Sequence, residues 1–160
     1  MTIGTPQSRV QLSTTPPQPE RQDMTTTTNT TVDLARRLLM AFEAGEDTVV
    51  DDVIHPAYVD HAPADGPGGP DGVRQSIRWL RETFGDRHVI IEDLFAGDDR
   101  IVARVRFSAT QTGELFGTPP SGRRFETEQI HIWRVAERRL AEHWMVRDDL
   151  ATMRQLGALD

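Results

Sequence analysis

The stretch from Glu126 to Gln155, ETEQIHIWRVAERRLAEHWMVRDDLATMRQ, decides how the chain is expected to fold. Apolar and polar residues alternate with a period of two from Thr127 to Val135 and again from Leu140 to Arg147, which predicts two strands. Residues 136–139 are mostly charged and predict a short turn between them. The stretch therefore predicts a β-hairpin that leads into a C-terminal helix.

The alternation places one histidine on each strand of this hairpin, and we expect the two to share a face. That face carries Gln129, His131, Trp133 and Val135 from the first strand and Ala141, His143, Met145 and Arg147 from the second. The opposite face carries Ile130, Ile132, Glu142, Trp144 and Val146. Residues opposite each other in an antiparallel pair lie about 4.5–5.5 Å apart at Cβ, and diagonal residues about 7–8 Å. Because histidine titrates near neutral pH, His131 and His143 together predict a functional site.

The composition excludes several classes of protein. The chain has 160 residues, a net charge of -7 and a pI near 5.2. This length predicts a single domain. The acidic balance argues against nucleic acid as a partner, because phosphate binding needs a basic surface. No apolar run approaches the roughly 20 residues of a membrane span, and no signal-type segment opens the chain. We therefore expect a cytoplasmic protein that does not bind membranes.

Two missing residue types narrow the chemistry further. The chain has no cysteine, and all of its 18 basic residues are arginine. Thiolate catalysis and a lysine Schiff base therefore have no side chain to use. The five histidines lack short ligand spacing, and no nucleotide-binding or serine-hydrolase motif is present. We expect acid–base chemistry without a metal or organic cofactor.

The first half of the chain predicts a tail followed by helices. Residues 1–30 are rich in Thr, Pro and Gln and predict a disordered tail, with one domain over residues 31–160. A helix is predicted from Thr31 until Gly45 ends it, then a short helix over residues 46–54 and an extended piece over residues 56–61. Asp71 is the expected N-cap of a third helix, whose apolar stripe is Val73, Ile77, Leu80 and Phe84.

The second half predicts strands. Residues 88–95 and 101–111 flank a Gly-Asp-Asp-Arg turn and predict a hairpin, and residues 115–122 predict a loop before the hairpin that contains both histidines. Helices followed by a run of strands indicate an α+β domain in which about three helices pack on one face of a curved antiparallel sheet. Such a shape predicts a ligand cavity between helices and sheet.

Several segments resemble one protein family. They are His55-Pro56, residues 58–61 (YVDH), Gly69-Pro70, residues 115–125 (LFGTPPSGRRF), residues 128–131 (EQIH), Glu142-His143 with Asp148, and residues 154–157 (RQLG). Their order and spacing are similar to those of the SnoaL-like polyketide cyclases over roughly residues 31–157. The resemblance implies a cone-shaped α+β barrel of the nuclear-transport-factor-2-like type that often forms homodimers through the sheet.

The resemblance also implies a reaction. Cyclases of this family close a polyketide ring by intramolecular aldol condensation without a cofactor, and a carboxylic side chain acts as acid and base. Gln129, His131 and His143 match their pocket residues. The catalytic aspartate of the best-understood cyclases lies two residues after the second histidine, where this chain has Met145. Asp148 matches an aspartate that is common in the wider family.

From this pattern we predict the site residues. His131 and His143 are the expected acid–base pair. Asp148 is expected either to take part in the site, as an acid or by orienting His143, or to cap the C-terminal helix. The residues expected to bind substrate are Gln129, Trp133, Met145, His61, Gln111 and Phe116. Gln111 replaces a histidine often found in the family, and the pair Asp60-His61 would reach the pocket mouth.

The functional hypothesis is a polyketide cyclase acting on an aromatic polyketide or related secondary metabolite. Two alternatives remain open at this stage. Met145 favours a non-catalytic protein that binds a small molecule, and the same fold also hosts hydration, epoxide opening and hydroxylation. The apolar set Ile130, Ile132, Trp144 and Val146 predicts a homodimer interface on the opposite face of the sheet.

Overall fold

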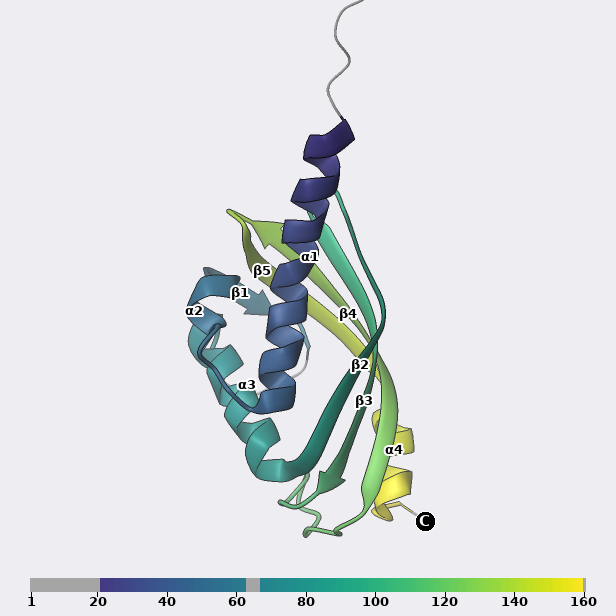
Figure 1. The fold of residues 1–160 in the computed structure, drawn as a ribbon. Helices are drawn as coiled ribbons and strands as arrows, with labels where there is room; N and C mark the ends of the chain where they lie inside the picture. The colour runs from purple at the N-terminus through teal and green to yellow at the C-terminus, as the bar shows by residue number, and fades with distance from the viewer. Residues whose placement is uncertain (1–20, 63–66, 160) are drawn as a thin grey trace, which may run out of the picture.

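The computed structural model describes residues 21–62 and 67–159, with side chains from residue 30 onwards. It contains four helices and five strands in these ranges (Figure 1). In chain order they are α1 (Arg21–Ala44), α2 (Val50–Val53), β1 (Ile54–Asp60), α3 (Gly69–Thr83), β2 (Phe84–Gly97), β3 (Arg100–Gln111), β4 (Arg124–Ala136), β5 (Arg139–Arg147) and α4 (Asp149–Leu156).

The five strands form one mixed sheet in the order β1-β5-β4-β3-β2. Strands β2 to β5 pair with antiparallel neighbours, as the two predicted hairpins require. Strand β1 pairs with β5 in parallel, so the expectation of a wholly antiparallel sheet was wrong at this edge. A parallel neighbour needs a long crossover connection rather than a hairpin. The segment from β1 to β5 includes α3 and the other three strands, and local periodicity did not reveal that distant pairing.

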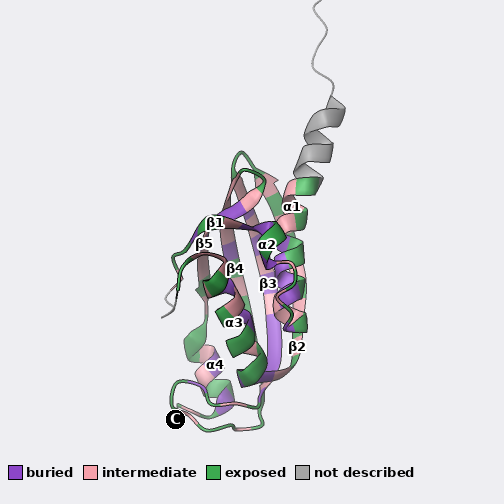
Figure 2. Ribbon diagram, turned by 90° about the vertical axis from the view of Figure 1, so that its left-hand side faces the viewer, coloured by how far each residue is buried: buried purple, intermediate pink, exposed green. Residues whose placement is uncertain are grey.

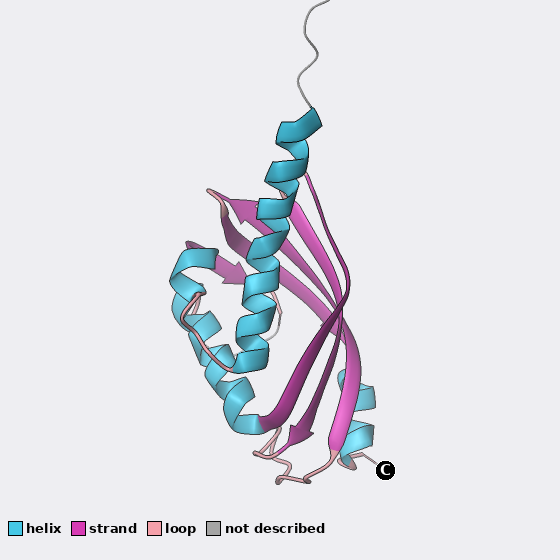
Figure 3. Ribbon diagram, viewed as in Figure 1, coloured by secondary structure: helices cyan, strands magenta, loops and turns pink. Residues whose placement is uncertain are grey.

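Three helices cover one face of the sheet, as expected (Figure 3). The core between α1–α3 and the sheet contains Leu38, Ile54, Tyr58, Ile77, Ile101, Val105, Trp133 and Leu140 among its buried side chains. Figure 2 shows the buried positions gathered where the helices face the strands. Burying one aliphatic side chain of this size stabilises the fold by about 1.5–3 kcal/mol. We call this side the inner face of the sheet, and the opposite side the outer face.

Several element boundaries differ from the predictions. Helix α1 begins at Arg21 rather than at Thr31, while residues 1–20 of the predicted tail lie outside the described residues. Helix α3 begins at Gly69 and is preceded by Gly68, so Asp71 lies in its first turn and is not the N-cap. Pro70 explains the earlier start, because proline fits the first turn of a helix. Phe84 begins β2 instead of ending α3.

The far end of the sheet has its own small core. Phe84, Phe107, Ala109, Leu115, Phe125 and Leu156 are buried together there. Helix α4 lies beside β4 at this end (Figure 1), where the Gln155 side chain exchanges two hydrogen bonds with the backbone of Glu126. None of the described helices is both long and apolar enough to cross a membrane.

Candidate active site

The β4–β5 hairpin brings the predicted histidines onto the inner face. His131 lies opposite Met145, and His143 lies opposite Trp133, so the two histidines are diagonal neighbours. The turn between the strands has positive φ angles at Glu137 (49°) and Arg138 (61°). Positive φ at both central residues is typical of the tight turn that matches the twist of a two-stranded hairpin. The ladder shifts by one residue between Val135, which pairs with Leu140, and Arg134, which pairs with Glu142. This shift brings His143 to the same face as His131, because a shift of one residue moves side chains to the other face.

The two histidines belong to a continuous chain of four side chains. Nδ1 of His143 lies 3.0 Å from Oδ1 of Asp60, and Nε2 of His143 lies 3.0 Å from Nδ1 of His131. Nε2 of His131 then lies 3.0 Å from the side-chain oxygen of Gln129. We call the four residues Asp60, His143, His131 and Gln129 the relay. It crosses the inner face from the edge strand β1 through β5 to β4.

The relay is buried in its middle and open towards its ends. His131 and His143 are only 8% and 7% exposed, whereas the Asp60 side chain is 37% exposed and Gln129 is half-buried. The buried indole of Trp133 stacks against both imidazoles with its centroid 5.2 Å from each. Trp133 was expected to bind substrate, and the structure places it in the core, where it supports the two rings.

Burial controls the charge of the relay. Loss of water, with a smaller contribution from His143, lowers the pKa of His131 to about 3, so this ring is neutral at physiological pH. Burial by itself would raise the pKa of Asp60. The hydrogen bonds from His143 and from the Ala62 N–H, together with the electrostatic effect of the two histidines, outweigh burial, and the net shift of the Asp60 pKa is downwards. The relay therefore contains a carboxylate at one end and a neutral imidazole next to Gln129.

Asp60 is the site residue that the sequence predictions omitted. The sequence singled out the pair Asp60-His61 as a possible pocket mouth but selected only His61 as a binding residue. Asp60 follows the buried Tyr58 at a spacing of two, which was the available signal that it faces inwards. Its pairing with His143 depends on the parallel contact between β1 and β5, which local periodicity did not reveal.

The chain is similar in sequence to several known proteins. Residues 32–156 match the SnoaL-like polyketide cyclase family. The chain belongs to this family. It is 31% identical over 135 residues to the aklanonic acid methyl ester cyclase DnrD of Streptomyces peucetius, covering 81% of this chain and 92% of DnrD. It is also 31% identical over 125 residues to the nogalonic acid methyl ester cyclase of Streptomyces nogalater, covering 75% of this chain and 92% of that enzyme.

A solved structure extends the comparison to three dimensions. TsrD from Streptomyces laurentii superposes with a TM-score of 0.75 at 34% identity, and the match covers 89% of this chain and all of TsrD (100%). The α+β architecture expected from the sequence is thus that of the SnoaL-like cyclases. Met145, where the sequence resemblance led us to expect an acid, lies directly opposite His131.

Asp148 is held away from the histidine pair. Its carboxylate accepts a hydrogen bond from the backbone N–H of Ala151 at 2.8 Å and caps α4. Both ring nitrogens of His143 meet His131 and Asp60, so Asp60, and not Asp148, orients this ring. Of the two roles expected for Asp148, the structure therefore gives it the capping role.

Gln111 ends β3, and Phe116 lies in the loop that follows it, at the far end of the sheet. The Gln111 side chain is completely buried, and its amide nitrogen meets the backbone oxygens of Gly113, Thr118 and Pro119. Its oxygen accepts a hydrogen bond from the Ser121 hydroxyl at 2.7 Å. Phe116 is 68% exposed. Gln111 thus organises the loop, and neither side chain is part of the relay.

His61 points to the outer face. Its Nε2 lies 2.9 Å from a carboxylate oxygen of Glu142, and its ring stacks on Trp144 with a centroid distance of 4.6 Å. It therefore lies across the sheet from His143 rather than beside it. Among the described residues, no group of three or more His, Asp or Glu side chains is arranged to hold a metal ion.

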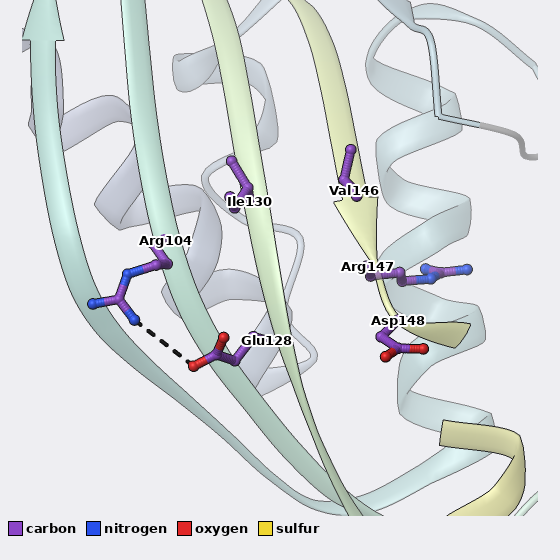
Figure 4. A pocket seen from close by; sticks show the side chains of 6 residues that line it. All are labelled: Arg104, Glu128, Ile130, Val146, Arg147 and Asp148. Carbon is purple, nitrogen blue, oxygen red and sulfur yellow. Dashed lines mark ion pairs between the residues drawn. The ribbon is translucent and has the colours of Figure 1, made fainter. Parts of the chain in front are cut away.

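Two surface hollows lie apart from the relay. One, of about 370 Å³, is on the outer face, and Figure 4 shows its six lining side chains from β3, β4, β5 and the start of α4. The other, of about 280 Å³, lies between the end of α1 and α3. Neither is lined by His131 or His143, so the ligand cavity expected above the pair is not one of these two.

Proposed function

We propose that this chain is a cofactor-independent cyclase that closes a ring of an aromatic polyketide ester by intramolecular aldol condensation. The observation that carries the proposal is the buried His131–His143 pair, which is bonded together on the inner face and anchored by Asp60. Membership of the cyclase family and its similarity to two polyketide methyl ester cyclases support the same reaction.

The proposed reaction moves one proton and forms one carbon–carbon bond. The histidine pair removes a proton from the carbon between the ester and a neighbouring carbonyl, and the resulting enolate attacks a ketone of the same molecule. The alkoxide that forms takes a proton back from the pair, so substrate and product have equal mass. A positioned general base of this kind contributes about 10²–10⁴-fold to a rate.

Gln129 and Met145 are proposed to flank the reacting atoms. Gln129 ends the relay and has an amide that can donate a hydrogen bond to a carbonyl or enolate oxygen. Met145 lies opposite His131 and supplies an apolar, polarisable surface beside the substrate ring. Because methionine cannot transfer a proton, the proton-transfer role falls to the histidines.

The test is a mass-resolved incubation with a panel of open-chain aromatic β-keto methyl esters, with a no-protein control and tryptophan fluorescence to follow binding. A product of unchanged mass and new retention time is expected. A gain of one water would replace the proposal with hydration, and a gain of one oxygen with hydroxylation. Saturable quenching with the ligand recovered unchanged would replace it with a binding protein, the function that Met145 favours.

We also propose that the chain forms a homodimer through its outer face and works in the cytoplasm. Ile130 and Val146 are 45% and 72% exposed there and border the larger hollow, while Arg104 and Glu128 form an ion pair at its rim (Figure 4). Exposed apolar side chains rimmed by charges are typical of an interface.

Sedimentation analysis of the purified protein checks the dimer. Val146→Glu would place a charge in the centre of the proposed contact and is expected to yield monomers that keep the far-UV circular dichroism of the wild type. A monomeric wild type, or a dimer unchanged by Val146→Glu, would contradict this interface.

A further inference from the structure

The hydrogen bonds of the relay need one proton more than two neutral histidines carry. Its three contacts each need one proton: one between Asp60 and His143, one between His143 and His131, and one between His131 and the Gln129 oxygen. A carboxylate and an amide oxygen are acceptors only, while two neutral imidazoles carry two protons in total. Either the relay holds a third proton, or the Gln129 amide is turned so that its nitrogen faces His131.

A third proton would have to lie on Asp60, His131 or His143, and the surroundings disfavour it on the first two. The low pKa of His131 follows from its burial and from the neighbouring His143, and the pKa of Asp60 is lowered rather than raised. The other charged groups that act on this part of the relay are Arg147, which also lowers the pKa of His131, and Asp60, which raises it. An amide oxygen and nitrogen are interchangeable in shape, so turning Gln129 satisfies every contact without a further charge.

We infer that Asp60 sets the tautomer of both rings, so that Nε2 of His131 carries the lone pair that acts as the base. The Asp60 carboxylate accepts the proton on Nδ1 of His143, which leaves Nε2 of His143 as an acceptor. His131 must then place its own proton on Nδ1, and its Nε2 faces the Gln129 amide. Asp60 is a positioning residue, and its contribution to turnover rests on the proposed function.

This assignment explains how the chain manages without an acid at Met145. When Nε2 of His131 accepts a proton from the substrate, Nδ1 of His131 can pass its proton to Nε2 of His143. The positive charge then lies on the ring that touches the Asp60 carboxylate rather than on the ring beside the substrate. The two histidines thus connect a buried reacting atom to a carboxylate two strands away in the sheet.

A second contact fixes the orientation of the Asp60 side chain. Oδ1 of Asp60 accepts hydrogen bonds both from Nδ1 of His143 and from the backbone N–H of Ala62, which lies 2.9 Å away. In Asp60→Asn the Ala62 N–H would hold the amide oxygen in the same place, because the amide nitrogen cannot accept that bond. Asp60→Asn is therefore expected to keep the tautomers, whereas Asp60→Ala removes the acceptor.

The experiment reads the tautomers directly by ¹⁵N NMR of the histidine rings in the full chain at pH 7.5. The wild type and Asp60→Asn are expected to show protonated Nδ1 in both His131 and His143. In Asp60→Ala both protons are expected to move to Nε2, since Gln129 can then accept from His131 in the orientation drawn. Glu142→Ala, which removes the carboxylate bound to His61 on the outer face, is the matched control and is expected to leave both rings unchanged.

Turnover of a β-keto methyl ester that the wild type cyclises gives the second measurement. Asp60→Ala is expected to lower kcat by roughly 10²–10⁴-fold with little change in KM, because Nε2 of His131 would then carry a proton. Asp60→Asn is expected to recover part of the lost kcat. If the wild type and both Asp60 variants show the expected tautomers but the wild type cyclises no ester, the proposed function is wrong and the tautomer assignment stands.

Two results would overturn the inference. The first is a wild type in which Nε2 of His131 is protonated at pH 7.5, alone or together with Nδ1. This measurement needs no variant, so poor folding of Asp60→Ala cannot obscure it. The second is an Asp60→Ala protein that is folded and has the wild-type ring tautomers.

Discussion

The same two kinds of side chain meet twice where β1 lies beside β5, once on each face of the sheet. On the inner face Asp60 contacts His143 at 3.0 Å, and on the outer face Glu142 contacts His61 at 2.9 Å. The distances are nearly equal, but the surroundings differ. The His143 side chain is 9% exposed and that of His61 is 39% exposed.

Burial gives the inner contact a consequence that the outer contact lacks. Both nitrogens of His143 are occupied by single partners, so the Asp60 contact continues into His131. On the outer face Glu142 is shared between His61 and Arg134, and the bonds from these two residues lower its pKa. Solvent and salt screen such exposed pairs, which makes their net contribution small. A short His–carboxylate distance alone therefore does not identify a site.

Turnover should separate the two faces most strongly. His131→Ala and His143→Ala each remove a member of the buried relay and are expected to abolish measurable cyclisation, a loss of at least about 10²-fold, while ligand affinity changes little. Glu142→Gln alters the outer contact only and is expected to retain wild-type kcat. Intact turnover in both histidine variants, measured with a cyclised β-keto ester, would contradict the assignment of function to the inner face.

Acid stability is the next largest difference. The pKa of His131 is lowered from 6.5 to about 3. At pH values between these two, the His131 ring is therefore protonated in the unfolded chain and neutral in the folded chain. Stability from this group is therefore complete above pH 6.5 and is lost as the pH falls towards 3, with a slope of up to about 1.4 kcal/mol per pH unit. The lowered pKa of Asp60 adds a loss in the same direction below its unfolded value of 3.8.

Urea unfolding between pH 7 and pH 4 measures this slope. His131→Gln removes the titrating ring and is expected to flatten it, whereas Glu142→Gln is expected to leave it nearly unchanged. Equal slopes in the wild type and His131→Gln would show that the inner face does not control acid stability.

A smaller effect is expected at Gln111, a fully buried polar side chain at the end of β3. Gln111→Ala leaves the backbone oxygens of Gly113 and Thr118 without this partner and is expected to cost about 1–3 kcal/mol of unfolding free energy. Phe116→Ser, an exposed change in the same loop, is the control and is expected to stay within about 0.5 kcal/mol. Equal denaturation midpoints for Gln111→Ala and Phe116→Ser would contradict the role of Gln111 in organising the loop.

Much of the fold could be predicted because its signals are local. The alternation in β4 and β5 gave the correct inner and outer side chains, since the side-chain period of a strand is two. The helical stripe before Gly45 and the run of strands after residue 85 gave the α+β class. Boundaries were less predictable, because Pro70 and Gly68 allow α3 to begin before the polar residue that looked like a cap.

The site could be predicted only in part. His131 and His143 lie on the two strands of one hairpin, which local alternation predicts. Their contact also needs the register shift between Arg134 and Val135, because a regular ladder from the turn would place Glu142 opposite Trp133. Asp60 comes from a strand far away in the sequence, and only the parallel β1–β5 pairing brings it to His143. Gln111 was predicted to bind substrate because of its position in the family pattern. In the structure its amide nitrogen instead binds backbone oxygens of the following loop.

The sequence by itself determined the hairpin and, within each strand, which residues share a face with His131 or His143, because a strand dictates the direction of neighbouring side chains over a few residues. The tertiary structure decided which carboxylate meets them. Asp60 and Asp148 are both aspartates close to a histidine in the family pattern, yet one anchors His143 and the other caps α4. A contact between distant strands depends on how the whole sheet is ordered, and no local pattern contains that order.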